Sequence, residues 1–213
     1  MNQLSHEQAA RREKTLLASL LLSAWGPVVT VIAVILSEST TQLADFIRRS
    51  VELLALFVSW WVFRYLQRNK GKYSPAVKAR MEKLAGSGVA AALGCSGLVM
   101  LFLAFTPFSA NDPGGNVYPG MIVAFLGLVV NSWFWQRYAW MTREQYNPIT
   151  DAQRRLYRAK ALVDTCVIFA LSAVAFFPGY PATRYIDTLG SVILALYLLW
   201  SSFRTLRPPQ DNC

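Results

Sequence analysis

The fold is decided by the stretch Ala44-Asp45-Phe46-Ile47-Arg48-Arg49-Ser50-Val51-Glu52, which runs directly into Leu53-Leu54-Ala55-Leu56-Phe57-Val58-Ser59-Trp60-Trp61-Val62-Phe63. In a helix, positions i, i+3, i+4 and i+7 lie on one face. The charged residues of the first part have that spacing and would share one face: Asp45, Arg48, Arg49 and Glu52. The combined stretch of about 20 residues is long enough to cross a bilayer. Ionisable side chains at that depth face the protein interior or a water-filled path, so this face is the first candidate for function.

The composition is that of a membrane protein. Of the 213 residues, 54% are hydrophobic and 15% are charged, whereas globular domains carry roughly 25% charge. The three cysteines, Cys95, Cys166 and Cys213, have no CxxC spacing, which indicates neither a disulfide framework nor a zinc ribbon. The one histidine, His6, precedes the first apolar segment, and no catalytic or phosphate-binding motif is present. We therefore expect no enzymatic activity and no cofactor.

Six apolar segments follow a polar start. Each is near the length that crosses about 30 Å of hydrocarbon, and the lack of strict alternation favours helices over barrel strands. The sequence therefore predicts an all-α, polytopic membrane protein with a cytoplasmic segment at 1–14, a six-helix transmembrane domain at 15–207 and a short tail at 208–213. The predicted spans are Thr15–Leu36, Leu43–Phe63, Leu84–Phe105, Tyr118–Trp140, Ala159–Phe177 and Tyr185–Leu206.

The basic residues predict the orientation. Eighteen of the 21 lysines and arginines lie in the first segment, the tail and the two connections on the same side, and Arg184 alone lies on the other side. By the positive-inside rule both termini are cytoplasmic. The expected location is the cell membrane, as a multi-pass protein (the inner membrane if the source is bacterial). Contact with the bilayer and its anionic headgroups accounts for the net charge of +9, so no nucleic-acid partner is expected.

Polar residues in the later spans are further candidates. Asn131 lies in an apolar context in the fourth span, where it would clamp two helices together or line a polar path. Lys160 and Asp164 are spaced i, i+4 at the start of the fifth span, and Asp164 lies about one turn deeper. Asp187 begins the sixth span and would serve either the helix N-terminus or a functional role. Cys166 is expected to pack rather than to bind a metal.

Small residues in the third span predict close helix packing. Gly86, Gly88 and Gly94 occur there with a run of three alanines, Ala90 to Ala92. Side chains of this size let the backbones of neighbouring membrane helices approach each other closely.

Four strings in this order resemble the transmembrane module of the cation diffusion facilitator family. The strings Ala44–Glu52, Lys78–Ala85, Gly127–Asn131 and Tyr185–Tyr197 are similar to that family's second helix, entry to the third helix, fourth helix and sixth helix. The resemblance covers roughly residues 15 to 207. It implies six membrane helices, export of a divalent metal cation in exchange for protons, and a homodimer. The sequence contains neither the family's C-terminal metal-sensing domain nor its histidine-rich loop.

This sequence differs from the family at the metal site. In the family, that site consists of a His/Asp-x-x-x-Asp pair on helix two and another on helix five. Side-by-side placement puts Arg48 and Glu52 on the first pair and Leu156 and Lys160 on the second. A shift of four residues puts Lys160 and Asp164 on the second pair instead. Glu52 and Asp164 are then the candidate metal ligands, and Arg48 would repel zinc from a standard tetrahedral site.

Three hypotheses follow. The first is a divergent exporter of a divalent cation, with oxygens that suit manganese, magnesium or cobalt, and with Glu52 and Lys160 able to carry the proton. Its oxygens would come from Asp45, Glu52, Asn131, Asp164 and Asp187. The second is a non-transporting scaffold or regulatory protein, in which Asp45–Arg49 and Arg48–Glu52 salt bridges are joined by Lys160 or Asp164. The third is a carrier of anions or organic solutes that binds through Arg48 and Arg49.

Overall fold

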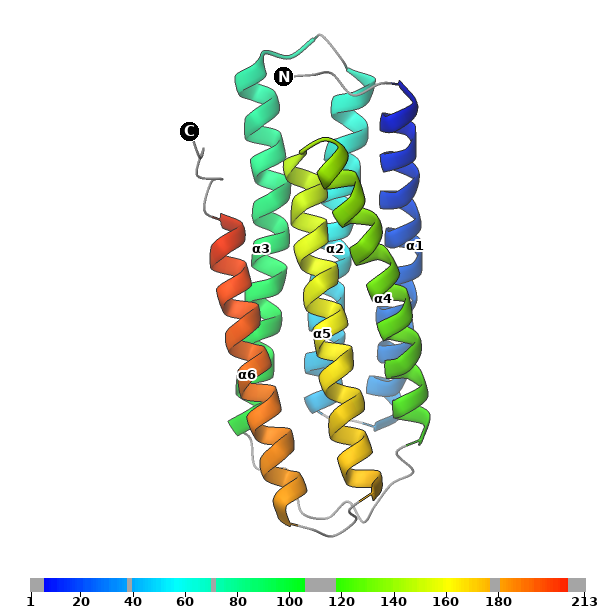
Figure 1. Cartoon of the computed structure of the whole chain (residues 1–213), viewed down its shortest axis with the longest axis vertical. Helices are drawn as coiled ribbons and strands as arrows, with labels where there is room; N and C mark the ends of the chain where they lie inside the picture. The colour runs from blue at the N-terminus through cyan, green and yellow to red at the C-terminus, as the bar shows by residue number, and fades with distance from the viewer. Residues whose placement is uncertain (1–5, 38–39, 70–71, 106–117, 177–180, 207–213) are drawn as a thin grey trace.

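The computed structural model describes residues 6–37, 40–69, 72–105, 118–176 and 181–206. This part of the chain forms six α-helices and no strand, which confirms the all-helical prediction (Figure 1). The helices run alternately up and down, so that the starts of α1, α3 and α5 lie at the same end as the ends of α2, α4 and α6. Their bounds are α1 His6–Ser37, α2 Thr40–Arg68, α3 Pro75–Phe105, α4 Tyr118–Glu144, α5 Pro148–Phe176 and α6 Pro181–Leu206.

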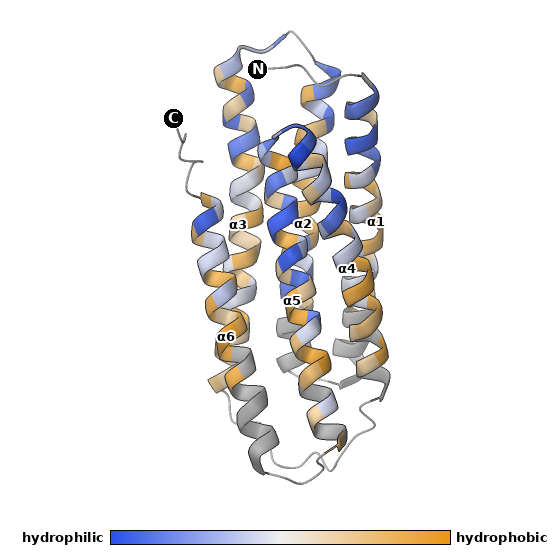
Figure 2. Ribbon diagram, viewed as in Figure 1, coloured by the Kyte–Doolittle hydropathy of each residue, from blue (hydrophilic) through white to orange (hydrophobic). Residues whose placement is uncertain are grey.

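The common end of these helices is hydrophilic, and we call it the basic end because most lysines and arginines lie there (Figure 2). Several helices extend beyond the predicted spans in this direction. The helix α5 begins at Pro148 rather than Ala159, and α3 begins at Pro75 rather than Leu84. The apolar runs therefore marked the middles of these helices but not their polar first turns.

The start of α5 is fixed by an N-cap. The Asn147 side-chain oxygen accepts hydrogen bonds from the backbone N–H of Ile149 at 3.0 Å and of Thr150 at 3.3 Å. Pro148 occupies the first helical position, where its missing N–H costs nothing. The Asn147 amide also donates to Glu82 Oε1 at 3.3 Å, so the cap joins α3 to the start of α5.

A second side chain ties α1 to the end of α4. Arg12 is 2% exposed and donates hydrogen bonds to the backbone carbonyls of Met141 at 2.8 Å and Gln145 at 2.7 Å. Met141 lies in the last turn of α4 and Gln145 directly follows that helix, so Arg12 adds a donor at the carbonyl-rich end of α4. Burial lowers the pKa of the Arg12 guanidinium and nearby Glu144 acts in the opposite direction. Arginine remains charged in proteins, so a cation faces this helix C-terminus.

The helices pack mainly in pairs, α3 with α6, α4 with α5 and α1 with α2. A Cβ atom on Gly94 of α3 would lie 3.1 Å from Ser202 Oγ of α6, and that hydroxyl donates to the Ala90 carbonyl at 2.7 Å. The predicted close approach of α3 is therefore confirmed at Gly94. It is wrong for Gly86 and Gly88, where an added Cβ would meet nothing within 4 Å, because both lie away from neighbouring helices.

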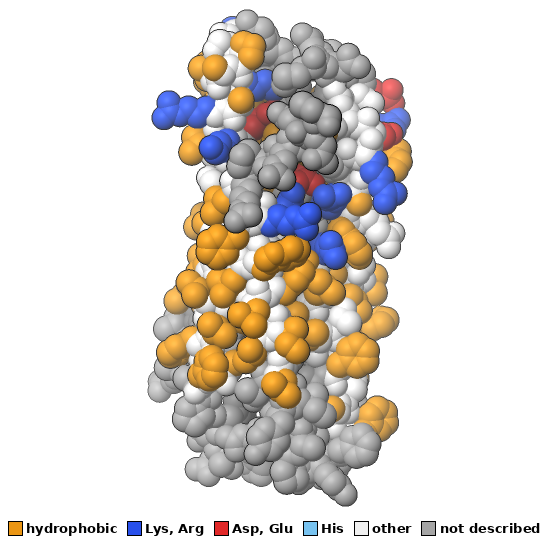
Figure 3. Space-filling view, turned by 60° about the vertical axis from the view of Figure 1, so that its left-hand side comes forward, with side chains coloured by type: hydrophobic (Ala, Val, Ile, Leu, Met, Phe, Trp, Pro, Cys, Tyr) orange, Lys and Arg blue, Asp and Glu red, His pale blue; other side chains and the backbone are white. Residues whose placement is uncertain are grey.

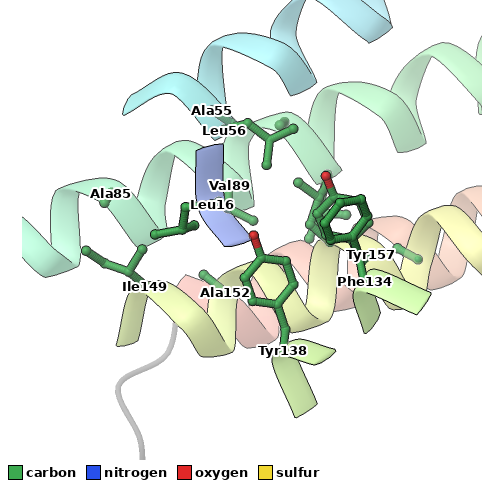
Figure 4. Close-up of a cluster of buried hydrophobic side chains, with 14 of the residues drawn as sticks. Leu16, Ala55, Leu56, Ala85, Val89, Phe134, Tyr138, Ile149, Ala152 and Tyr157 are labelled. Carbon is green, nitrogen blue, oxygen red and sulfur yellow. The ribbon is translucent and has the colours of Figure 1, made fainter. Parts of the chain in front are cut away.

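Apolar side chains fill the bundle and also cover its outside. Phe134, Tyr138 and Tyr157 are at most 1% exposed and lie in the central cluster shown in Figure 4. On the outside, Phe102 is 67% exposed and Phe169 71%. Figure 3 shows hydrophobic side chains forming a broad band below a group of lysines and arginines. An apolar exterior of this extent is expected of a surface that meets lipid or a partner.

Four arginine side chains stack on tryptophans of three helices, α2, α4 and α6. Tryptophan rings gather at membrane–water interfaces, where arginine reaches out of the apolar layer. Judged by length and composition alone, one helix of the described part is apolar enough to cross a membrane, over Pro75–Phe102 of α3. The stacked pairs are Arg64 on Trp60 at 5.2 Å, Arg137 on Trp133 at 5.9 Å, Arg158 on Trp135 at 6.0 Å and Arg204 on Trp200 at 5.2 Å.

Candidate functional site

A buried ion pair joins α2 to α5 in the middle of the bundle. Lys160 Nζ lies 3.1 Å from Glu52 Oε2, and the two side chains are 16% and 10% exposed. The other carboxylate oxygen of Glu52 accepts a hydrogen bond of 3.0 Å from the Ser96 hydroxyl of α3. Three helices therefore meet at one carboxylate, and each of its oxygens has a partner.

A second carboxylate lies one helical turn farther along α5. Asp164 Oδ2 accepts a hydrogen bond of 2.7 Å from the Asn131 side-chain amide of α4. The approach of the helices is close here, because a Cβ on Gly127 would lie 3.0 Å from the same Asp164 oxygen. Asn131 is thus an interhelical clamp, the first of its two predicted roles, and it holds an acidic group rather than another amide.

Both carboxylates lie near additional cations. The charge of Arg48 acts on Glu52 and on Asp164, and Arg49 also acts on Asp164. The Arg49 side chain runs beside α1, where a Cβ on Gly26 would lie 3.3 Å from a guanidinium nitrogen. The site therefore combines two acids with three basic groups. The basic groups attract the two carboxylates of the protein, and they repel a further cation unless one of them moves.

Of the candidate residues, the structure brings six together: Arg48, Arg49, Glu52, Asn131, Lys160 and Asp164. The side chains of Asp45 and Asp187 lie outside the described residues. Leu156 is 1% exposed within the apolar core. Cys166 is a free thiol packed against that core. Within the described part, no group of three or more His, Cys, Asp or Glu side chains is placed to hold a metal ion.

Two contacts of the site were missed by sequence reasoning. Ser96 was not among the predicted site residues, although it donates a hydrogen bond to Glu52. Tyr157 precedes Lys160 by three positions, and its ring centroid lies 5.3 Å from the Lys160 ammonium. The i, i+3 spacing of Tyr157 and Lys160 was the available signal, since it puts the ring and the cation on one helix face.

The site lies within a known transport domain. The cation efflux transmembrane domain matches residues 16–209. This chain belongs to that family. No curated protein matches it. The family match makes the chain a membrane-embedded transporter of the cation diffusion facilitator type, as the four strings predicted, and this class consists of transporters rather than enzymes.

Proposed function

We propose that this cation efflux protein exports a divalent cation in exchange for protons, with Glu52 and Asp164 as the carboxylates that bind the cation. The observation that carries the proposal is the Glu52–Lys160 pair, an acid held inside the bundle by a cation of the chain itself. A buried ion pair adds little net stability compared with apolar residues, so its occurrence inside an apolar bundle favours a functional role.

In this mechanism Lys160 takes the place of the transported cation between cycles. An incoming divalent cation displaces the ammonium from Glu52, and Lys160 releases one proton to water on the side where the cation enters. When the cation leaves on the other side, Lys160 takes up a proton there and returns to Glu52. One proton thus moves in the direction opposite to the cation, and no buried carboxylate is left without a positive partner.

The available donors favour a hard cation. Glu52 and Asp164 offer carboxylate oxygens, Ser96 a hydroxyl and Asn131 an amide oxygen once its hydrogen bond with Asp164 is rearranged. Such oxygens suit Mn²⁺ or Mg²⁺ better than Zn²⁺, which prefers imidazole and thiolate. Neither histidine nor cysteine contributes to this cluster in the described part of the chain.

We further propose that the six helices all cross the cell membrane with the basic end in the cytoplasm, and that two copies form a homodimer. The orientation follows from the positive-inside rule applied to the eighteen basic residues. The stacked arginine–tryptophan pairs support an interface at that level of the bundle.

The test is flux in proteoliposomes with Mn²⁺ outside and a pH-sensitive dye inside. Wild-type protein is expected to give saturable Mn²⁺ entry with opposite proton movement. The variant Glu52→Gln, which keeps the shape and removes the charge, is expected to lower both fluxes to the background of empty vesicles. Glu82→Gln is the matched control, because Glu82 is 6% exposed but bonded to the α5 cap, and its flux should stay near wild type. Full flux in Glu52→Gln would overturn the assignment.

One observation favours the second candidate, a scaffold that moves no ion. Both Glu52 oxygens already have protein partners, and Asp164 Oδ2 is held by Asn131. A scaffold would show no flux for any divalent ion from folded protein. It would also keep its stability and partners when Glu52 and Lys160 are both replaced by apolar residues, whereas a transporter would lose its activity.

A further inference from the structure

Tyrosine side chains connect α1 to the α4–α5 pair just beyond the ion pair, toward the basic end. The Tyr138 hydroxyl of α4 lies 2.8 Å from Ser19 Oγ of α1. Ser19 Oγ also donates to the Leu16 carbonyl at 2.9 Å, and the Tyr138 hydroxyl donates to the Thr15 carbonyl of α1 at 3.5 Å. The helix α1 packs mainly on α2, and these long side chains extend from the other helices to meet it (Figure 4).

Tyr157 of α5 makes the second connection. Its hydroxyl donates to the Ser19 carbonyl at 3.2 Å and lies 3.2 Å from Ser23 Oγ, which is left to act as the donor. Its ring stacks on Tyr138 at 5.6 Å and contacts Phe134 at 5.0 Å. The three rings form an aromatic layer, and each residue is at most 1% exposed. In the proposed transport path, a cation moving between Glu52 and the basic end would meet this layer.

One face of α5 continues on both sides of that layer. Gln153, Tyr157, Lys160 and Asp164 are spaced i, i+4, i+7 and i+11, which aligns them along the helix. Gln153 is fully buried, and neither its amide oxygen nor its nitrogen has a hydrogen-bond partner among the described residues. Buried amides normally have partners. The Gln153 amide is therefore a polar group on this face beyond the aromatic layer, and it could bond a hydrated ion that moves along the proposed path.

We propose that Tyr157 is a positioning residue that links the state of Lys160 to the closure of the path at the basic end. Its ring holds the Lys160 ammonium, and its hydroxyl holds α1 against α5. When a cation displaces Lys160 from Glu52, the ammonium leaves the ring face, Tyr157 is freed to change position, and α1 separates from α5. This inference rests on the proposed function, since it assigns a consequence to cation binding at Glu52.

The test measures how fast a thiol at position 153 reacts with a membrane-impermeant maleimide applied at the basic end. The full chain carries Gln153→Cys, and its native cysteines Cys95, Cys166 and Cys213 are replaced by alanine. Tyr157→Phe keeps the ring over Lys160 and removes the bonds to α1. We expect labelling about fivefold faster in Tyr157→Phe and about twofold faster in Ser23→Ala, in line with the loss of neutral hydrogen bonds. Tyr197→Phe on α6 is the control and should label at the parent rate.

A second measurement uses saturating Mn²⁺, because the effect of Mn²⁺ on the labelling rate would not depend on a tyrosine with a purely structural role. Mn²⁺ should speed labelling in the parent chain, and this response should vanish in Tyr157→Leu, which loses the ring and the hydroxyl together. Parent-rate labelling in Tyr157→Phe, or an equal increase in Tyr197→Phe, would overturn the inference.

The two proposals fail in different ways. If Mn²⁺ flux depends on Glu52 but Tyr157→Phe labels at the parent rate, the inference alone is wrong. If Mn²⁺ produces neither flux nor a labelling response in the parent chain, the proposed function is wrong and the linkage to Lys160 falls with it.

Discussion

Glu52 and Glu82 are two buried acids with nearly the same exposure, 8% and 6%, and very different surroundings. Glu82 lies at the basic end, where it accepts a hydrogen bond from the Asn147 amide that caps α5. Glu52 lies deeper in the bundle, where it is paired with Lys160 and bonded to Ser96. Burial alone therefore does not distinguish an acid bonded to a helix cap from an acid in an ion pair between two helices.

The distinction lies in what each partner does elsewhere. Asn147 also binds the first N–H groups of α5, so the contact of Glu82 extends an element of secondary structure. Lys160 lies in the body of α5 rather than at a helix end, and its ammonium lies over the ring of Tyr157. An acid paired with a flexible lysine side chain is suited to exchange its partner, whereas an acid bonded to a helix cap is suited to hold a helix in place.

The largest effect is expected from Lys160→Met, which leaves Glu52 buried without its cation. Removing one member of a buried ion pair costs about 3–5 kcal/mol in the free energy of unfolding. Chemical unfolding of the detergent-solubilised protein, followed by circular dichroism, measures the change. The double variant Glu52→Leu/Lys160→Met should recover most of the loss, because no isolated charge remains. A loss below about 1 kcal/mol in Lys160→Met would show that water already shields Glu52.

The sequence was sufficient to predict the six helices and to name candidate residues for the site. Charges at i, i+3, i+4 and i+7 in an apolar segment single out Arg48 and Glu52 because such groups are costly in a membrane. Glu52 and Lys160 were named as a proton-carrying pair, and the structure places the two side chains in one ion pair although they lie 108 positions apart in the sequence. The Ser96 hydroxyl that also bonds Glu52 was not predicted.

Partners of this kind depend on how helices rotate against each other, which no local pattern encodes. Ser96 and Ser87 look alike in the sequence of α3. Ser87 donates to the Leu84 carbonyl of its own helix, while Ser96 donates to Glu52 across the bundle. The start of α5 was missed for another reason: the apolar run was used to place it, although Asn147-Pro148 is itself a signal for a helix start.

An intermediate effect is expected from Ser96→Ala, because it removes a hydrogen bond to a charged acceptor. Such bonds contribute about 1.5–3 kcal/mol, so unfolding free energy should fall by that amount, and the Mn²⁺ concentration at half-maximal flux should change as well. Ser87→Ala is the matched control on the same helix and should change neither quantity. Equal losses in the two variants would mean that the alanine affects α3 generally, and that Ser96 has no special connection with Glu52.

The smallest effect is expected at the helix cap, from Asn147→Ala. Loss of an N-cap costs about 1 kcal/mol of stability. Asn147→Ser keeps a cap acceptor but cannot reach Glu82 in the same way, so it should lose less. Because this cluster only holds α5 in place, the half-maximal Mn²⁺ concentration should remain that of wild type in both variants. If Asn147→Ala instead lowered flux as strongly as Glu52→Gln, the basic end would be part of the transport path itself, and the division between a structural and a functional acid would be wrong.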